Sequence, residues 1–237
     1  MQHDYMGMSW CDKGECLTPD RGPILPSIFC GGRKLSMDAA QMPEDIEVRS
    51  CPVLVLLSGG IDSSAVVAFY LEKQCDLSCL FVDYGQAARS NEFQAAQKIV
   101  AHYRVRLRRV SCSGVDKKWG GEILGRNAFL LFIALMEFDA LSGIIATGIH
   151  ADTSYYDCSE SFATSMKTIF NGYTNGRVRI GAPFLEWSKP DIWEFCQEQN
   201  VPIHMTYSCE LGREQPCGEC SSCKDLEALY ARPKLDS

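Results

Sequence analysis

Apolar runs and amphipathic segments alternate along the chain from residue 52 onward, whereas residues 1–50 show no sustained periodicity. The alternation predicts strands over 52–57, 77–83, 105–110 and 143–147, and helices over 62–73, 89–103, 127–140, 158–171, 189–199 and 223–231. Strands separated by helices indicate an α/β protein with a doubly wound parallel sheet. In such a fold, ligands bind at the carboxyl ends of the strands.

The pattern also divides the chain into three parts. Residues 1–50 contain four of the ten prolines and predict an N-terminal extension or a small appended subdomain. Residues 51–204 carry the alternating pattern and predict the α/β domain. Residues 205–237 are rich in cysteine and predict a metal-binding C-terminal segment.

The first predicted strand runs directly into the sequence SGGIDSS at 58–64, which begins a helix. The two glycines let backbone N–H groups approach an anion, the serines add hydroxyl donors, and the helix N-terminus favours negative charge. A strand–helix turn capped by Asp62 is the structural alternative. The Walker spacing and its lysine are absent, so a different kind of phosphate-binding loop is predicted. Its candidate ATP-binding residues are Ser58, Gly59, Gly60, Asp62, Ser63 and Ser64.

Polar residues also follow the other predicted strands. Asp83 ends the second strand, and a polar run at 147–152 follows the fourth strand. Arg126 and Asn127 begin the apolar helix at 127–140, where the guanidinium can bind phosphate or carboxylate and the amide can cap the helix. A surface arginine at a helix start is the alternative for Arg126. Because parallel strands end at one edge of the sheet, these residues are expected to form one site.

The C-terminal segment contains Cys209, Cys217, Cys220 and Cys223 in a C-x7-C-x2-C-x2-C pattern. Four thiols at this spacing are typical of tetrahedral zinc. Disulfides are disfavoured because the 13 cysteines are scattered and odd in number and no secretory signal precedes them. An iron–sulfur cluster is a further alternative that the compact spacing favours less.

Composition narrows the function. The chain has 237 residues, of which 46% are hydrophobic and 22% charged, which is enough for one sizeable core. No apolar run approaches the roughly 20 residues of a membrane span, so no membrane partner is expected. The net charge of −7 argues against a nucleic-acid surface and favours a small-molecule substrate. The unpaired thiols predict a reducing, cytoplasmic location.

Several motifs together resemble the 7-cyano-7-deazaguanine synthase family, the nitrile-forming enzymes of the queuosine precursor pathway. SGGIDSS alone resembles the pyrophosphate loop of the N-type ATP pyrophosphatases, which cleave ATP between the α and β phosphates. The resemblance covers about residues 53–232. It depends on SGGIDSS at 58–64, DYGQ at 83–86, GRN at 125–127, TGIHADTSYYDC at 147–158, the stretch 183–189, and CGECSSC at 217–223.

The resemblance implies an ATP-dependent C–N ligase that uses ATP with Mg²⁺ and holds a structural zinc. The carboxylate of 7-carboxy-7-deazaguanine would attack the α-phosphorus of ATP, ammonia would convert the adenylate to an amide, and a second ATP would lead to the nitrile. Asp62, Arg126 and Lys189 are the expected catalytic residues, Asp83 joins the loop in binding ATP, and the expected substrate residues are Asn127, Gly148, Asp152, Ser154, Tyr156 and Asp157. The zinc would be bound by Cys209, Cys217, Cys220 and Cys223.

The chain departs from the family at three places. About fifty residues precede the first strand, the segment 111–124 is shorter than usual, and the sequence YYDCS at 155–159 lacks the proline and arginine of the family motif. These departures concern the acceptor of the activated carboxylate. Synthase-like relatives from anti-phage defence systems, which are linked to attaching a deazaguanine to protein, are therefore the second hypothesis.

Two further hypotheses are weighed. A zinc-stabilised nucleotide-binding protein without catalysis would not need an intact SGGIDSS loop. A tRNA-modifying sulfur transferase is disfavoured by the acidic balance and by cysteines that the zinc pattern already uses. The apolar helix over 127–138 indicates a surface for a homodimer.

Overall fold

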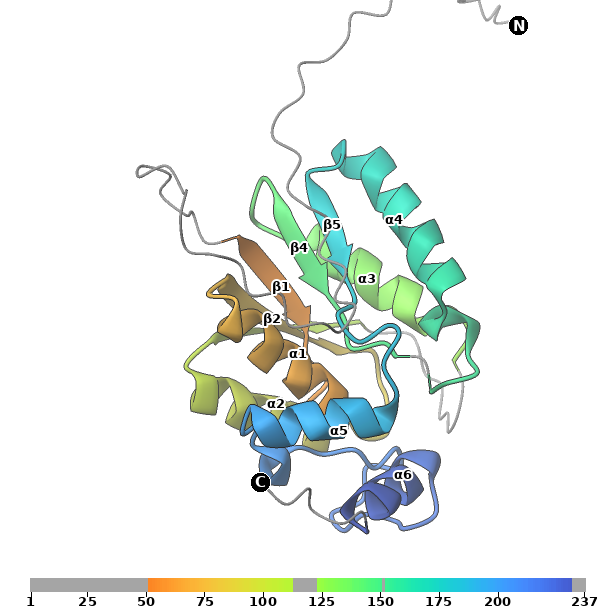
Figure 1. Ribbon diagram of the computed structural model, residues 1–237. Helices are drawn as coiled ribbons and strands as arrows, with labels where there is room; N and C mark the ends of the chain where they lie inside the picture. The colour runs from red at the N-terminus through yellow and green to blue at the C-terminus, as the bar shows by residue number, and fades with distance from the viewer. Residues whose placement is uncertain (1–50, 113–122, 151, 232–237) are drawn as a thin grey trace, which may run out of the picture. The chain divides into compact units, whose positions relative to one another are not determined.

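The computed structural model describes residues 51–112, 123–150 and 152–231. The extension predicted over 1–50, most of the segment 111–124 and Ala151 lie outside the described residues. A five-stranded, fully parallel sheet forms the centre of the fold, in the order β3-β2-β1-β4-β5 (Figure 1). Its strands are β1 (Pro52–Leu56), β2 (Asp76–Asp83), β3 (Arg106–Ser111), β4 (Gly143–Ala146) and β5 (Val178–Gly181).

Helices cover both faces of this sheet, so the predicted α/β doubly wound class is confirmed. One apolar cluster joins the sheet to α1 (Ile61–Glu72), α2 (Arg89–Tyr103) and α5 (Lys189–Glu198). A second cluster joins the other face to α3 (Arg126–Met136) and α4 (Glu160–Thr174). The remaining helices are the short η1 (Tyr156–Cys158) and η2 (Ile203–Met205), and α6 (Ser221–Tyr230).

The central strand β1 is buried on both faces. Val53, Leu54 and Val55 are each at most 1% exposed, which explains why the strand is a continuous apolar run. β1 pairs with β2 on one side and with β4 on the other. The strand order reverses between β1 and β4, and a crevice therefore opens at their carboxyl ends.

Two predicted helices have clearly different bounds in the structure, and one strand was not predicted. The apolar helix predicted to reach Ala140 ends at Met136, because Asp139 and Ser142 belong to the turn before β4. The helix predicted over 158–171 begins at Glu160, after Ser159 caps it by accepting a hydrogen bond from the Phe162 N–H. β5 was not predicted, since the exposed Arg179 interrupts its apolar run, unlike the continuous run of the equally short β4.

Among the described residues, no helix combines the length and apolar character that crossing a membrane requires.

Candidate active site

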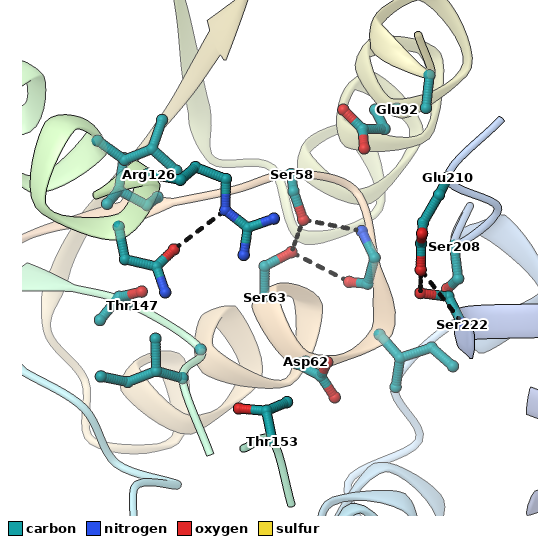
Figure 2. A pocket seen from close by; sticks show the side chains of 18 of the residues that line it. Ser58, Asp62, Ser63, Glu92, Arg126, Thr147, Thr153, Ser208, Glu210 and Ser222 are labelled. Carbon is teal, nitrogen blue, oxygen red and sulfur yellow. Dashed lines mark hydrogen bonds between the residues drawn. The ribbon is translucent and has the colours of Figure 1, made fainter. Parts of the chain in front are cut away.

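A cavity of about 390 Å³ lies at the carboxyl ends of β1 and β4 (Figure 2). Its volume is in the range of small-molecule sites. The loop that follows β1 forms its floor, and the residues after β4, the start of α3 and the C-terminal segment contribute walls. Of the predicted site residues, the cavity lining includes Ser58, Gly60, Asp62, Ser63, Arg126, Asn127, Gly148 and Lys189.

Hydroxyl groups organise the loop after β1. The Ser58 and Ser63 oxygens lie 3.1 Å apart, and Ser58 also accepts a hydrogen bond from the Gly60 N–H at 3.3 Å. The hydroxyls of Ser63 and Ser64 both donate to the Gly60 carbonyl. The loop therefore exposes the N-terminus of α1 to the cavity, and the backbone N–H groups there can bind an anion. Gly60 is the N-cap of α1 and no side chain caps the helix, so the alternative role of Asp62 as a cap is not observed.

Glycine suits positions 59 and 60 of this loop for different reasons. Gly59 has a φ of +88°, and a Cβ there would collide with the backbone of α2 at Glu92. A Cβ at Gly60 would find the Ser58 hydroxyl at 3.5 Å and the Tyr207 carbonyl at 3.7 Å, which is ordinary contact. Gly59 and the fully buried Ser64 do not line the cavity. Gly59 thus allows the loop to pack against α2, and Gly60 keeps the cavity open.

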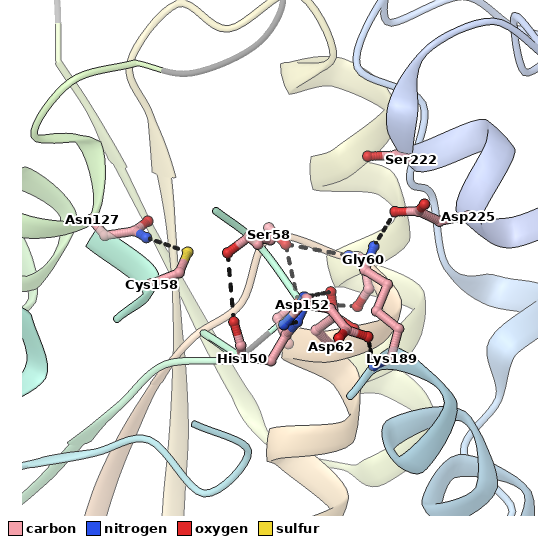
Figure 3. Close-up of polar contacts among 12 residues, drawn as sticks. Ser58, Gly60, Asp62, Asn127, His150, Asp152, Cys158, Lys189, Ser222 and Asp225 are labelled. Carbon is pink, nitrogen blue, oxygen red and sulfur yellow. Dashed lines mark hydrogen bonds and ion pairs between the residues drawn. The ribbon is translucent and has the colours of Figure 1, made fainter. Parts of the chain in front are cut away.

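Charged groups gather below the loop (Figure 3). The Asp62 carboxylate lies 3.7 Å from the Nε2 atom of His150, and the Lys189 ammonium pairs with Asp225 at 2.8 Å. Burial lowers the pKa of His150, although the nearby Asp62 charge opposes this effect. Burial also acts to lower the pKa of Lys189, but the charge of Asp62 and the hydrogen bond to Asp225 outweigh it and raise that pKa. Lys189 is therefore a cation that Asp225 holds in place beside the loop after β1.

Two of the predicted substrate residues bind the N-termini of helices. The Asp152 carboxylate accepts a hydrogen bond from the Lys189 N–H at 2.6 Å, at the start of α5. The buried Asp157 carboxylate accepts from the Asn127 N–H at 3.1 Å, and the Asn127 amide returns a bond to the Asp157 carbonyl. Neither aspartate is among the residues that line the cavity. They attach the segment after β4 to α5 and α3.

Three other predicted residues also lie away from the cavity lining. The Asp83 carboxylate binds the Arg109 guanidinium at 2.6 Å and the Gly85 N–H at 3.1 Å. Burial acts to raise the pKa of Asp83, but these two hydrogen bonds outweigh it and lower that pKa. Ser154 is exposed, and Tyr156 is exposed with its ring against Phe162.

Several residues that were not predicted line the cavity. Some lie outside the recognised motifs, and others lie inside a motif that was interpreted differently. They include Glu92, His150, Thr153, Tyr207, Glu210, Ser222 and Asp225. The polar run after β4 did indicate His150 without assigning it a role. For Glu92, the only signal was an acidic residue in the first turn of a helix that follows a strand end.

The C-terminal segment is hydrogen-bonded to the loop that follows β1. The Tyr207 N–H donates to the Gly59 carbonyl at 2.9 Å. Glu210 accepts hydrogen bonds from the hydroxyls of Ser221 and Ser222, which begin α6. The Asn91 amide of α2 donates to the Gly212 carbonyl at 3.2 Å. This segment therefore forms one wall of the cavity instead of an independent appendage.

The four predicted cysteine ligands come together in this wall. The Sγ atoms of Cys209, Cys217, Cys220 and Cys223 all lie within 4.8 Å of one another. Backbone N–H groups of Glu219 and Cys220 point at the Cys217 sulfur, and they lower the pKa of this thiol to about 6. Thiolates held by N–H donors at these separations fit a tetrahedral metal ion, and zinc suits four sulfur ligands. The geometry therefore supports a metal site without identifying the metal.

The fold and the site together define a class: α/β proteins with a glycine- and serine-rich loop after the central strand and a four-cysteine cluster in a C-terminal segment. The family described as "Queuosine biosynthesis protein QueC" matches residues 122–232, and the family described as "Asparagine synthase" matches residues 47–116.

Relatives with a known activity cover most of the chain. It is 31% identical to the 7-cyano-7-deazaguanine synthase of Oceanobacillus iheyensis over 198 residues, covering 72% of this chain and 89% of the relative. It is 30% identical to the enzyme of the same name from Parasynechococcus marenigrum, with 78% and 96% covered. The chain belongs to the 7-cyano-7-deazaguanine synthase family.

Solved structures with a similar course of the chain were also found. A 4-thiouridine synthetase in a complex with RNA and bound ATP has a TM-score of 0.46 and 18% identity, covering 76% of this chain and 50% of that chain. NMN synthetase from Francisella tularensis has a TM-score of 0.38 and 12% identity, covering 80% of each chain.

Proposed function

We propose that this protein is an ATP-dependent ligase that activates the carboxylate of 7-carboxy-7-deazaguanine and produces 7-cyano-7-deazaguanine. The observation that carries this proposal is the SGGIDSS loop on the floor of a cavity that also contains Arg126 and Lys189, in a chain that belongs to the synthase family. An anion-binding helix N-terminus and two cations are what the transfer of an adenylyl group requires.

In the proposed first step, a carboxylate oxygen of the substrate attacks the α-phosphorus of ATP. The bond between this phosphorus and the bridging oxygen breaks, and pyrophosphate leaves with the electron pair. The loop N–H groups and Lys189 would stabilise the charge that develops on pyrophosphate, and Arg126 offers donors to an anionic group of either ligand. Asp62 is the residue that would hold Mg²⁺, which would neutralise phosphate charge.

In the proposed second step, ammonia attacks the acyl carbon, AMP leaves, and a proton is lost, which gives the amide. The amide oxygen then attacks the α-phosphorus of a second ATP and releases pyrophosphate. Loss of AMP, which carries away the former amide oxygen, and of both protons of the amide nitrogen leaves the nitrile. The mechanism needs no covalent enzyme intermediate, so positioning and electrostatics would supply the rate acceleration.

The identity of the amine decides between the two leading hypotheses. Ammonia would give the nitrile, whereas an amine of a partner protein would give a conjugate. The departure from the family motif at 155–159 lies in η1 and its flanks, where the exposed Tyr156 is available to a partner. The ammonia reaction is the one that family membership favours.

The test is to supply ATP, Mg²⁺ and 7-carboxy-7-deazaguanine with and without ammonium and to follow the products by mass spectrometry. We expect AMP and pyrophosphate to form in proportion to the deazapurine supplied. The deazapurine should be converted to the amide and the nitrile only when ammonium is present. Asp62→Asn is the matched variant, which should lose turnover while the fold is kept. No AMP formation with this carboxylate would overturn the proposal, and AMP formation without nitrile would favour a protein amine.

We further infer a cytoplasmic homodimer that holds one zinc per chain. Four clustered thiols fit a reducing location. Exposed apolar side chains on α3 and α4, among them Met136 and Tyr173, support self-association through these two helices.

A further inference from the structure

Glu92 differs from the other carboxylates of the cavity in its partners. Asp225 pairs with Lys189, Glu210 accepts from two serine hydroxyls, and Asp62 lies beside His150. Glu92 accepts one hydrogen bond on Oε2, from the Gln86 amide at 2.9 Å. Within the described part of the chain, its Oε1 atom receives no hydrogen bond, although the residue lines the cavity (Figure 2).

The side chain of Glu92 is held in place by the turn between β2 and α2. Gln86 Nε2 also donates to the Val82 carbonyl at 3.2 Å, and Gln86 Oε1 accepts from the Tyr84 N–H at 3.0 Å. Gln86 is thus fixed at three points, and it fixes one oxygen of Glu92. A carboxylate positioned in this way presents its other oxygen to the cavity in a constant direction.

The surroundings of Glu92 are those of a binding group. Burial raises its pKa, while the Gln86 hydrogen bond and the positive charge of Arg126 act in the opposite direction. A partly desolvated acceptor without a partner costs stability and is typically retained where a ligand supplies the missing donor. The ligand of Glu92 should therefore present N–H groups.

The pattern of donors selects among the ligands of the proposed reaction. An ionised carboxylate only accepts hydrogen bonds, and it binds best to two adjacent donors. The guanine-type edge of a deazaguanine presents N1–H and the 2-amino group side by side. The corresponding edge of adenine presents an amino group next to the N1 lone pair, which a carboxylate would repel.

We propose that Glu92 recognises the substrate base by accepting hydrogen bonds from its N1–H and 2-amino groups, and that it thereby selects a guanine-type base. The inference rests on the proposed function for the identity of that base. It assigns the recognition to Glu92 because this residue lines the cavity, whereas Asp152 and Asp157 are not among the lining residues.

The test compares binding of 7-carboxy-7-deazaguanine with that of its analogue without the 2-amino group, by calorimetry. The wild-type protein should bind the first more tightly by about 10- to 100-fold, as expected for a hydrogen bond to a charged group. In Glu92→Gln, Gln86 would keep the amide oxygen in the place of Oε2, so an NH2 group would face the donors of the base. The preference, which is the ratio of the affinities for 7-carboxy-7-deazaguanine and for the analogue, should then fall to about twofold or less, with the affinity for ATP unchanged.

Asp152→Asn is the matched control, because the asparagine oxygen can still accept from the Lys189 N–H, and its preference should equal that of the wild type. A measurement on the wild-type protein avoids any folding defect of the variant. Because burial raises the pKa of Glu92, lowering the pH should reduce the preference as the carboxylate takes up a proton. Of the other groups near Glu92, Asp83 has a lowered pKa and Tyr84 has a raised pKa, so neither changes charge before Glu92 does as the pH is lowered.

The inference is overturned if the wild type shows no preference, if Glu92→Gln keeps it, or if that variant loses affinity for ATP instead. Failure of the proposed function gives a different result, since a protein that binds the carboxylate with this preference but forms no AMP would retain the recognition by Glu92.

Discussion

Two substitutions can distinguish the structural role of Gly59 from the proposed anion-binding role of Gly60 in the loop after β1. At Gly59 the positive φ and the backbone of α2 exclude any side chain, so Gly59→Ala should cost about 2 kcal/mol or more in the free energy of unfolding. At Gly60 a side chain fits the protein but occupies the space of an anion, so Gly60→Val should keep the stability and lose ATP cleavage. Urea unfolding and pyrophosphate release measure the two effects. Equal destabilisation by both changes, or ATP cleavage in Gly60→Val, would contradict this division.

Single residues also show why the site could be predicted only in part. SGGIDSS placed a loop on the cavity correctly, because glycine and serine in that order after a strand have few other uses, and its binding of phosphate stays a prediction. Asp152 and Asp157 were predicted to bind substrate, whereas their carboxylates bind backbone N–H groups. An aspartate that caps a helix and one that binds a ligand look alike in a sequence. Glu92 belongs to none of the recognised motifs, and its proposed role depends on Gln86, six residues earlier in the chain.

At the scale of elements, the long buried strands and most helices followed from periodicity, but β5 did not. Its four residues are stabilised by parallel pairing with β4, which is an interaction between distant segments. The helix before it, α4, was predicted because its buried residues recur with helical spacing, from Phe162 to Phe170. Local patterns therefore predict elements with a helical period or a continuous apolar run, whereas a short strand that lacks such a run depends on pairing across the sheet.

The exposed faces of α3 and α4 lead to a prediction about assembly. Met136 and Tyr173 are 81% and 72% exposed, and the Tyr173 ring contacts Phe132 between the two helices. Covering such side chains in a dimer would remove apolar surface from water. We expect light scattering to give twice the chain mass for the wild type and the single mass for Tyr173→Glu. Lys167→Glu, on the same helix, is the control for added charge, and a wild-type monomer would refute the assembly.

For the whole molecule, the structure predicts that the cysteine site controls the cavity. The segment that contains it donates the Tyr207 N–H to Gly59 and supplies Glu210 to the wall. Cys220→Ser should lower metal content and raise the KM for ATP by about tenfold, because a loosened segment no longer supports the loop. Cys112→Ser, outside the cluster, is the control. Full zinc content in Cys220→Ser, or unchanged kinetics after metal loss, would contradict this coupling.

The hydrogen bond between Tyr207 and Gly59 has a consequence for synthesis of the protein. Gly59 leaves the ribosome long before Tyr207, and the cysteines follow later still. The sheet up to β5 can pair while the C-terminal segment is still inside the exit tunnel, since chains fold progressively from the N-terminus. The nascent chain would then display an open, solvent-exposed phosphate loop. The cavity would close only later, when Tyr207 and the four clustered cysteines emerge and acquire their metal.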